Sequence, residues 1–343
     1  MVVPLRHPEP VNGGHVLSVQ PTGEIEWQTC KRIQVSGSHD ARLSVRTATH
    51  TADRCTHVEV AGNPVKFFQG HNLWGTDDLP ALVVETCHAV AALVGVSPSE
   101  DEVASWLAGD IRLTCVDATE SFHLNNRAEV LAFLRSAEQT AHLSHRGRGQ
   151  LVKGSTLYFG KNSRRWSLKL YAKGPEIERK GHRQEIVLAL PSAKAWADQT
   201  LRAELRLHSL ELRRIGLDHV RDWITADGLP SGVTAKLLRD RFEGMTMTTT
   251  AHLSADILET LRPALRLAVQ AWEAGSDLRT QLPHRTFYKY RRELLVHGID
   301  IATRMPREVS NVVPLYRVLE AKPAQVPEWA IGTPLYFEPR RVA

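Results

Sequence analysis

The chain begins with short stretches in which apolar and polar residues alternate. HVLSVQ, EIEWQT, RLSVRTA and HVEVA all lie before residue 62, and Gly, Asn, Asp and Ser separate them. Alternation with a period of two is typical of half-buried strands, and small polar residues between such runs are typical of turns. The pattern therefore predicts a β-rich start.

A helical period appears next, and strands then return. Residues 79–94 are almost continuously apolar, with Asp78 as a predicted N-cap and Pro80 in the first turn. Asn126 is the predicted cap of a second, amphipathic helix. This second helix is predicted at 125–144. The pattern also predicts a strand at 111–124, a β-hairpin at 155–160 and 166–173 around the turn KNSRR, and a strand at 200–209.

The pattern changes near residue 210, where runs such as LELRRIGLDHVRDWITADG and SADILETLRPALRLAVQAWEAG take over with helical spacing. We therefore predict an α+β fold, built from a mainly antiparallel sheet packed by helices and followed by a helical domain. The predicted boundaries are 1–210 for the α+β domain, 211–310 for the helical domain and 311–343 for an extended, proline-punctuated tail.

Strand alternation assigns the polar side chains to faces. In WSLKLYAK, Tyr171 shares a face with Lys169 and Lys173, while the leucines share the other. Glu204 lies on the outward face of LRAELRLH. Asp117 lies formally on the more apolar side of IRLTCVDATE, so either a bulge redirects it or it is partly buried.

This set of side chains has a specific chemical meaning if the strands are neighbours. Carboxylates are ligands for Mg²⁺, which neutralises charge on a phosphoryl group under attack. A tyrosine hydroxyl has a pKa near 10, and a nearby cation favours its phenolate. The combination suits covalent cleavage of a phosphodiester. The alternatives are structural: Tyr171 as a half-exposed strand residue, Asp117 as a turn cap, Glu204 as a surface ion pair and His71 as a loop histidine.

Charge indicates an acidic partner. The 343 residues carry a net charge of +5, and basic residues cluster in RLHSLELRR, KYRR and KNSRRWSLKLYAK.

The four cysteines form no CxxC pair, so we expect neither a zinc knuckle nor a disulfide framework. MVVPLRHPEP lacks a secretory apolar region, and no later run approaches ~18 apolar residues. We therefore expect a cytoplasmic protein with no membrane partner.

The order of the motifs resembles the filamentous-phage gene II replication proteins. The similar segments run from about Asn63 to Trp329: NPVKFFQGHNLWGTDDL, VDATESF, GSTLYFGKNSRRWSLKLYAKGPEIE, LRAELRLHSLELRRIGL, and NVVPLYRVLEA with PEWA. The resemblance implies a rolling-circle replication initiator with that family's nuclease domain. Such an enzyme nicks one strand of a phage or plasmid origin, holds the 5′ phosphate on a tyrosine and later rejoins the strand.

The resemblance also implies roles for particular residues. Tyr171 is the expected nucleophile, Lys173 the group that stabilises the phenolate or the phosphate, and Glu176 the acid or base for the leaving 3′ oxygen, or a fourth metal ligand. Mg²⁺ (or Mn²⁺) is the expected cofactor, with Asp117, Glu204 and His71 as its ligands. The expected partners are origin DNA, as a double-stranded circle and a displaced single strand, and the host helicase and polymerase.

The segment DLRTQLPHRTFYKYRRELLVHGIDI predicts a helix-turn-helix, with a basic surface helix as the alternative. Together with the hairpin, it supplies the candidate DNA-binding residues Arg164, Arg165, Lys169, Arg285, Lys289, Arg291 and Arg292.

Two other functions remain open at this point. One is a non-catalytic origin or operator binder, in which the β domain is purely structural. The other is a metal-independent tyrosine recombinase or topoisomerase, which would need an Arg/His surround and would not need Asp117 and Glu204.

Overall fold

The structure of the protein is a computed structural model. It describes residues 1–37, 39, 41–51, 54–181, 183–224, 232–243, 245–247, 261–273, 276–296, 300–302 and 323–339. Mixed helices and antiparallel sheets confirm the predicted α+β class.

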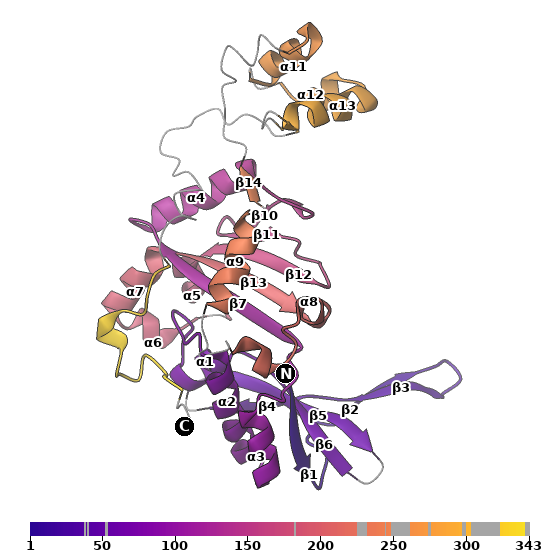
Figure 1. Cartoon of the computed structure of the whole chain (residues 1–343), viewed down its shortest axis with the longest axis vertical. Helices are drawn as coiled ribbons and strands as arrows, with labels where there is room; N and C mark the ends of the chain where they lie inside the picture. The colour runs from indigo at the N-terminus through magenta and orange to yellow at the C-terminus, as the bar shows by residue number, and fades with distance from the viewer. Residues whose placement is uncertain are drawn as a thin grey trace.

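A five-stranded antiparallel sheet forms the centre of the molecule (Figure 1). One face is apolar because alternate residues such as Leu168, Leu170 and Leu205 all point to it, and the helices α4 and α9 cover it. The predicted hairpin and the predicted strands on both sides of it are confirmed. In spatial order the strands are β10 (Gln150–Val152), β11 (Thr156–Phe159), β12 (Trp166–Ala172), β13 (Thr200–His208) and β7 (Cys115–His123), with α4 at Arg127–Thr140 and α9 at Val233–Glu243.

The β-rich start forms a second sheet, also antiparallel, that shares the same core. Its order is β1 (Val2–His7), β6 (Arg54–Ala61), β5 (Arg42–Thr51) and β4 (Ile33–Ser36), and β2 (His15–Val19) and β3 (Ile25–Cys30) form a separate hairpin that projects from the molecule (Figure 1). The helix α2 (Leu79–Leu93) begins where predicted, since the Asp78 side chain accepts a hydrogen bond from the Ala81 N–H. Asn126 caps α4 in the same way through the Glu129 N–H.

The remaining elements are short. They are α1 (Pro64–Gln69), α3 (Glu100–Leu107), α5 (Lys173–Glu178), α6 (Glu185–Leu188), α7 (Pro191–Asp198), α8 (Ser209–Ile215), η1 (Val220–Trp223), η2 (Glu328–Ala330), and the strands β8 (Ala141–Leu143), β9 (Gly147–Arg148) and β14 (Met245–Met247), which form a small sheet.

The domain boundary differs from the prediction at residue 210. Leu212, Val220 and Leu238 are buried in the same core as the sheets, so α8, η1 and α9 belong to the first unit. A second core, which includes Val269, Phe287 and other residues, holds together α11 (Pro263–Glu273), α12 (Leu278–Gln281) and α13 (His284–Leu295). Figure 1 shows these three helices beyond β14 and away from the five-stranded sheet, and their first buried residue is Leu261.

The tail prediction also needs a correction. Residues 323–339 pack on the first unit, where Ala330, Val326 and Leu335 contact a third cluster that contains Trp74 and Trp196. Apolar side chains in this segment explain the packing. Residues 303–322 and 340–343, which make up the rest of the predicted tail and the end of the predicted helical domain, lie outside the described residues. Within the described part of the chain, no helix is both long and apolar enough to cross a membrane.

Candidate active site

The polar face of the five-stranded sheet carries the predicted site. The strand register pairs residues of β12, β13 and β7 directly, and these pairs form three rows across the sheet. The first row is Tyr171, Arg202 and Ser121, the second is Lys169, Glu204 and Thr119, and the third is Ser167, Arg206 and Asp117. Because paired residues point to the same face, the expected tyrosine, lysine and two carboxylates do lie together.

Tyr171 is at the covered end of this face and is only 3% exposed. Its hydroxyl donates to Glu204 Oε2 at 3.4 Å. Two ammonium groups flank the ring, with Lys169 Nζ at 4.3 Å and Lys173 Nζ at 5.7 Å from its centroid. Burial raises the pKa of Tyr171 well above 10, and the nearby Arg202 opposes this only in part. In this arrangement Tyr171 is a phenol, not a phenolate.

Lys173 was predicted as a strand residue, but it is the first residue of α5, because β12 ends at Ala172. Its side chain is fully buried, and Nζ donates to Asn72 Oδ1 and Glu176 Oε2, both at 2.7 Å. Burial lowers the pKa of Lys173 to about 7; Arg202 acts in the same direction and Glu176 against it. The predicted group Tyr171, Lys173 and Glu176 is therefore brought together, with a lysine able to change charge near neutral pH.

Arg202 is a site residue that the sequence analysis did not single out. It lies opposite Tyr171 and is buried. Nε and Nη2 donate to Ser121 Oγ at 3.1 and 2.9 Å, and the guanidinium also donates to the backbone carbonyls of Asn72 and Leu73. The alternation of LRAELRLH already placed Arg202 beside Glu204, so the signal was present.

The two carboxylates of the expected metal site, Asp117 and Glu204, form ion pairs with basic side chains. Arg206 donates to Asp117 through two parallel hydrogen bonds of 2.7 and 2.6 Å, and Lys169 Nζ lies 2.8 Å from Glu204 Oε1. Asp117 is exposed, and the register of β7 with β13 runs without a bulge, so neither expectation for this residue is correct. β7 starts only at Cys115, so the buried Ile111 and Leu113, which made the side of Asp117 look apolar, lie before the strand and do not define its faces.

The structure does not bring His71 together with these carboxylates. His71 is completely buried; its Nε2–H donates to the carbonyl of Leu335 at 2.9 Å, and Nδ1 accepts the Leu73 N–H at 3.3 Å. Burial lowers the pKa of His71 to about 4. Both ring nitrogens are occupied in a neutral tautomer, so neither has a lone pair free for a metal. Asp117, Glu204 and His71 as arranged here do not fit a divalent cation.

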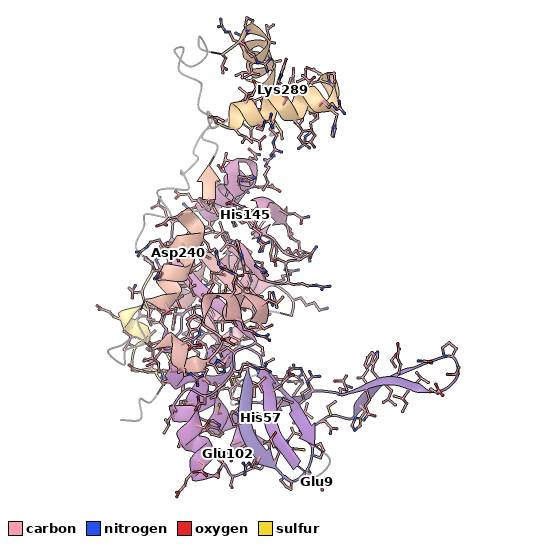
Figure 2. All side chains as sticks on the ribbon, turned by 45° about the vertical axis from the view of Figure 1, so that its right-hand side comes forward. Glu9, His57, Glu102, His145, Asp240 and Lys289 are labelled. Atoms are coloured by element: carbon pink, nitrogen blue, oxygen red, sulfur yellow. The ribbon has the colours of Figure 1, made fainter. Side chains whose placement is uncertain are left out.

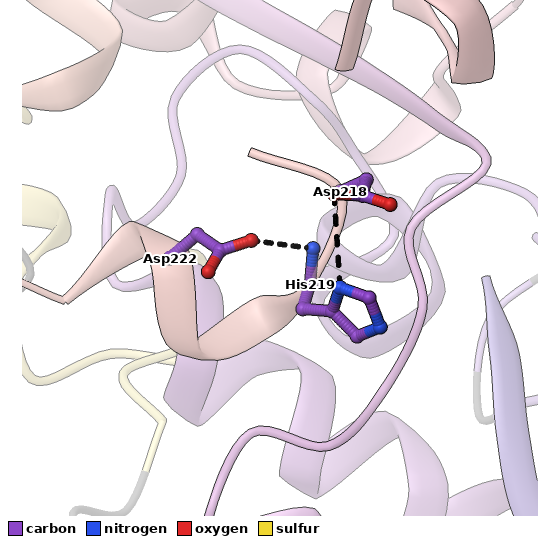
Figure 3. A group of neighbouring side chains, drawn as sticks. All are labelled: Asp218, His219 and Asp222. Carbon is purple, nitrogen blue, oxygen red and sulfur yellow. Dashed lines mark hydrogen bonds and ion pairs between the residues drawn. The ribbon is translucent and has the colours of Figure 1, made fainter. Parts of the chain in front are cut away.

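Among the described residues, one group of His and Asp side chains has its ligand atoms within 4.8 Å of one another: Asp218, His219 and Asp222 (Figure 3). Asp222 Oδ2 accepts the His219 N–H at 2.8 Å, which caps η1. Asp218 Oδ1 lies 3.7 Å from His219 Nδ1. Local capping accounts for this cluster.

The candidate DNA-binding residues fall into two places. Arg164 and Arg165 are exposed in the loop between β11 and β12, and Lys169 lies half-buried beside Tyr171. The short helix and the longer basic helix predicted in this segment are α12 and α13. Arg285, Lys289 (Figure 2) and Arg292 are exposed on α13.

Arg291, the remaining candidate on α13, has an internal partner. It donates to both carboxylate oxygens of the buried Asp300, at 2.7 and 2.8 Å. The pair ties α13 to residues 300–302. Arg291 is four residues from Phe287, on the buried side of the helix, whereas Arg285, Lys289 and Arg292 follow each other at the four- and three-residue spacing of one helical face.

Comparison with known proteins agrees with this division of the chain. A family model described as the N-terminal part of the phage replication-associated gene II protein matches residues 1–226, and a model of the C-terminal part of the same protein matches residues 254–339. The chain belongs to the family of replication-associated gene II proteins. The first model covers the two sheets of the first unit, and the second covers the helical unit together with residues 323–339, which pack on the first unit.

Individual members of this family are similar along most of the chain. The replication-associated gene II protein of Enterobacteria phage I2-2 is 36% identical over 331 residues, which cover 95% of this chain and 93% of the relative. The corresponding protein of Salmonella phage IKe is 24% identical over 322 residues, covering 80% of this chain and 75% of the relative. The resemblance to filamentous-phage replication proteins is confirmed.

Proposed function

We propose that the protein initiates rolling-circle DNA replication by nicking one strand at a phage or plasmid origin and later rejoining it. The intermediate is a 5′-phosphotyrosine on Tyr171. The observation that carries the proposal is the contact of the Tyr171 hydroxyl with the Glu204 carboxylate, on a ring whose centroid lies 4.3 Å from Lys169 Nζ and 5.7 Å from Lys173 Nζ, in a member of a phage replication family. A base, a nucleophile and cations in one place are the parts that phosphoryl transfer to tyrosine requires.

The reaction follows from these positions. The Tyr171 oxygen attacks the phosphorus, the new O–P bond forms, and the bond from phosphorus to the 3′ oxygen breaks. Glu204, which accepts the hydroxyl proton in the resting site, takes this proton. Lys173, held by Glu176 and able to lose a proton near neutral pH, gives one to the departing 3′ oxygen. Rejoining reverses these steps.

DNA must uncover the tyrosine before the reaction. The ion pair of Lys169 with Glu204 lies beside the Tyr171 ring, and both side chains are partly exposed. A DNA phosphate can replace the carboxylate as the partner of Lys169. This exchange frees Glu204 for proton transfer and brings the phosphate to the hydroxyl.

Nicking with Mg²⁺ and nicking with EDTA are compared to measure whether the reaction requires a divalent metal. Asp117 and Glu204 have the oxygen donors that Mg²⁺ prefers, but Arg206 and Lys169 occupy them here. The steps above therefore use the protein's own side chains only. The helical unit supplies origin binding through the exposed face of α13, and the host helicase and polymerase unwind and extend the nicked circle.

A nicking assay tests the proposal. Supercoiled plasmid with the cognate origin is incubated with wild type, Tyr171→Phe and Tyr158→Phe, with Mg²⁺ or EDTA. Tyr158 is the control because it lies on the same face one strand away, paired with Lys169. We expect Tyr171→Phe to lose about 10³-fold or more in rate and to form no SDS-resistant protein–DNA adduct, while Tyr158→Phe stays within about threefold of wild type. Equal nicking by Tyr171→Phe would refute the nucleophile.

One observation favours a second candidate, a tyrosine reaction that proceeds without metal. Lys169 and Lys173 lie by the Tyr171 ring and Arg202 pairs with Tyr171 across the strands, so the tyrosine has a cationic environment made by the protein alone. Nicking that persists in EDTA selects this candidate. Tight origin binding without nicking under either condition selects a non-catalytic binder instead.

A further inference from the structure

The segment 323–339, which we name the C-terminal strap, returns to the first unit after the helical unit in the chain. Figure 1 shows it in yellow beside α6 and α7. Its Ala324 N–H donates to the carbonyl of Ser121, on the edge strand β7, at 2.6 Å. Further along, Trp329, Leu335 and Phe337 reach α1 and the loop that follows it.

The strap holds this loop, residues 70–75, by side chains and backbone. The carbonyl of Leu335 accepts two hydrogen bonds, from His71 Nε2 at 2.9 Å and from Trp74 Nε1 at 2.8 Å. The Phe337 N–H donates to Gln69 Oε1 at 2.9 Å, just before the loop begins. Trp329 meets the Trp74 ring edge to face, with the ring centroids 5.4 Å apart.

Aromatic packing adds to these bonds. The Phe337 ring stacks on Phe68, in α1, with centroids 4.2 Å apart. The 70–75 loop, all of whose residues are described, contains no helix or strand of its own, yet His71 and Leu73 are completely buried. Buried polar groups of such a loop need partners, and several of those partners lie more than 260 residues away in the strap.

The same loop supports the groups around Tyr171. Asn72 Oδ1 accepts from Lys173 Nζ at 2.7 Å and from Gln184 Nε2 at 2.8 Å, and the Asn72 backbone N–H donates to Gln184 Oε1 at 3.1 Å. The carbonyls of Asn72 and Leu73 accept from the Arg202 guanidinium. The path from strap to tyrosine therefore has two short steps, strap to loop and loop to Lys173 and Arg202.

We infer that the C-terminal strap is a positioning element of the Tyr171 site: by fixing the 70–75 loop it holds Lys173 and Arg202 beside the nucleophile. The inference rests on the proposed nicking function. Residues of the strap, at 323–339, thus affect the reaction at Tyr171 indirectly, because they act on the site only through the 70–75 loop.

The test loosens the strap in the full chain. Trp329→Ala combined with Phe337→Ala removes the two aromatic contacts, and Ile331→Ala is the matched control because its side chain, in the same segment, is 51% exposed. Three quantities are measured: hydrogen exchange of peptides covering 69–75, acylation of Lys173 by an amine reagent followed by mass spectrometry, and the kcat of nicking alongside the Kd for origin DNA. Trp329→Phe with Phe337→Leu keeps apolar contact and serves as the rescue variant.

We expect the double alanine variant to exchange about tenfold faster in 69–75 and to expose Lys173 to acylation. Its nicking kcat falls about tenfold or more with the Kd unchanged, since small displacements at a reacting centre are costly. The control behaves as wild type, and the rescue variant recovers most of the rate.

Several outcomes overturn the inference. Unchanged exchange in 69–75 means that the strap does not hold the loop. Faster exchange with unchanged kcat means that the strap is only a structural support. If the wild type does not nick, the proposed function is refuted, and the positioning role of the strap falls with it. Hydrogen exchange in 69–75 still tests separately whether the strap fixes the loop.

Discussion

At the scale of single residues, burial decides the chemistry more than residue type does. Tyr171, Lys173 and His71 are all nearly or completely inaccessible. Burial raises the pKa of the tyrosine and lowers the pKa of the lysine and the histidine, so each is driven toward its neutral form. Burial thus favours the neutral forms of Tyr171 and Lys173, whereas the more exposed part of the same face carries the ion pairs Lys169–Glu204 and Arg206–Asp117.

His71 provides a prediction for stability against pH. Its pKa is about 4 in the folded protein and 6.5 in the unfolded chain, so the unfolded state binds more protons between these values. Stability therefore falls as pH falls through this window, and His71 alone accounts for about 2–3 kcal/mol between about pH 7 and about pH 4.5. His71→Gln should be less stable at neutral pH but lose less on acidification. Urea unfolding at the two pH values measures the difference, and equal losses in both proteins would contradict it.

At the scale of elements, α13 shows how one helix divides its basic residues between two tasks. The Arg291–Asp300 pair is internal, while Arg285, Lys289 and Arg292 remain exposed. A run of letters such as KYRR does not distinguish the two, because the helical period places neighbours on different sides.

Two single variants separate these tasks. Lys289→Ala should weaken DNA binding and reduce the slope of log affinity against log salt by about 1, with stability unchanged. Arg291→Ala leaves Asp300 buried without its ion-pair partner and with only the Ala302 N–H as a hydrogen-bond donor among the described residues, so the helical unit should lose about 2 kcal/mol, with the salt slope of the folded protein unchanged. DNA titrations across salt concentrations and thermal melts check both. A salt slope that falls for Arg291→Ala instead of Lys289→Ala would exchange the roles.

At the scale of the whole molecule, two cores are joined in one chain, and the strap brings the last described residues back to the first unit. The two matching family models divide the chain in the same region. Among the described residues the two cores have no buried residue in common, so each unit should respond separately to a cavity in its own interior.

Calorimetry tests this separation. Phe287→Ala opens a cavity in the helical core and should cost about 3–5 kcal/mol there, while the main transition stays in place. Leu168→Ala, in the large core, should lower the stability of the main transition by about 2–5 kcal/mol instead. A shift of both transitions by either variant would show that the units unfold together.

Much of this architecture was predictable because the signals are local. Alternation identified the strands that carry Tyr171 and Glu204, and the caps Asp78 and Asn126 marked helix starts correctly. The domain boundary was wrong because α8 and α9 have helical patterns whether they pack on the sheet or on other helices. Periodicity reports that a face is apolar but not which surface covers it.

The site follows the same division. The sequence by itself determined that Tyr171 and Lys169 share the polar face of one strand and that Glu204 lies on the polar face of another, since successive residues of a strand point to opposite faces. The structure pairs the two strands and so places the three side chains on one face. Only the tertiary structure decided that this face is covered at the tyrosine, that Arg202 and a buried Lys173 complete it, and that His71 bonds to the strap instead of a metal. Burial and partners depend on segments hundreds of residues apart meeting in space, and no local pattern encodes that meeting.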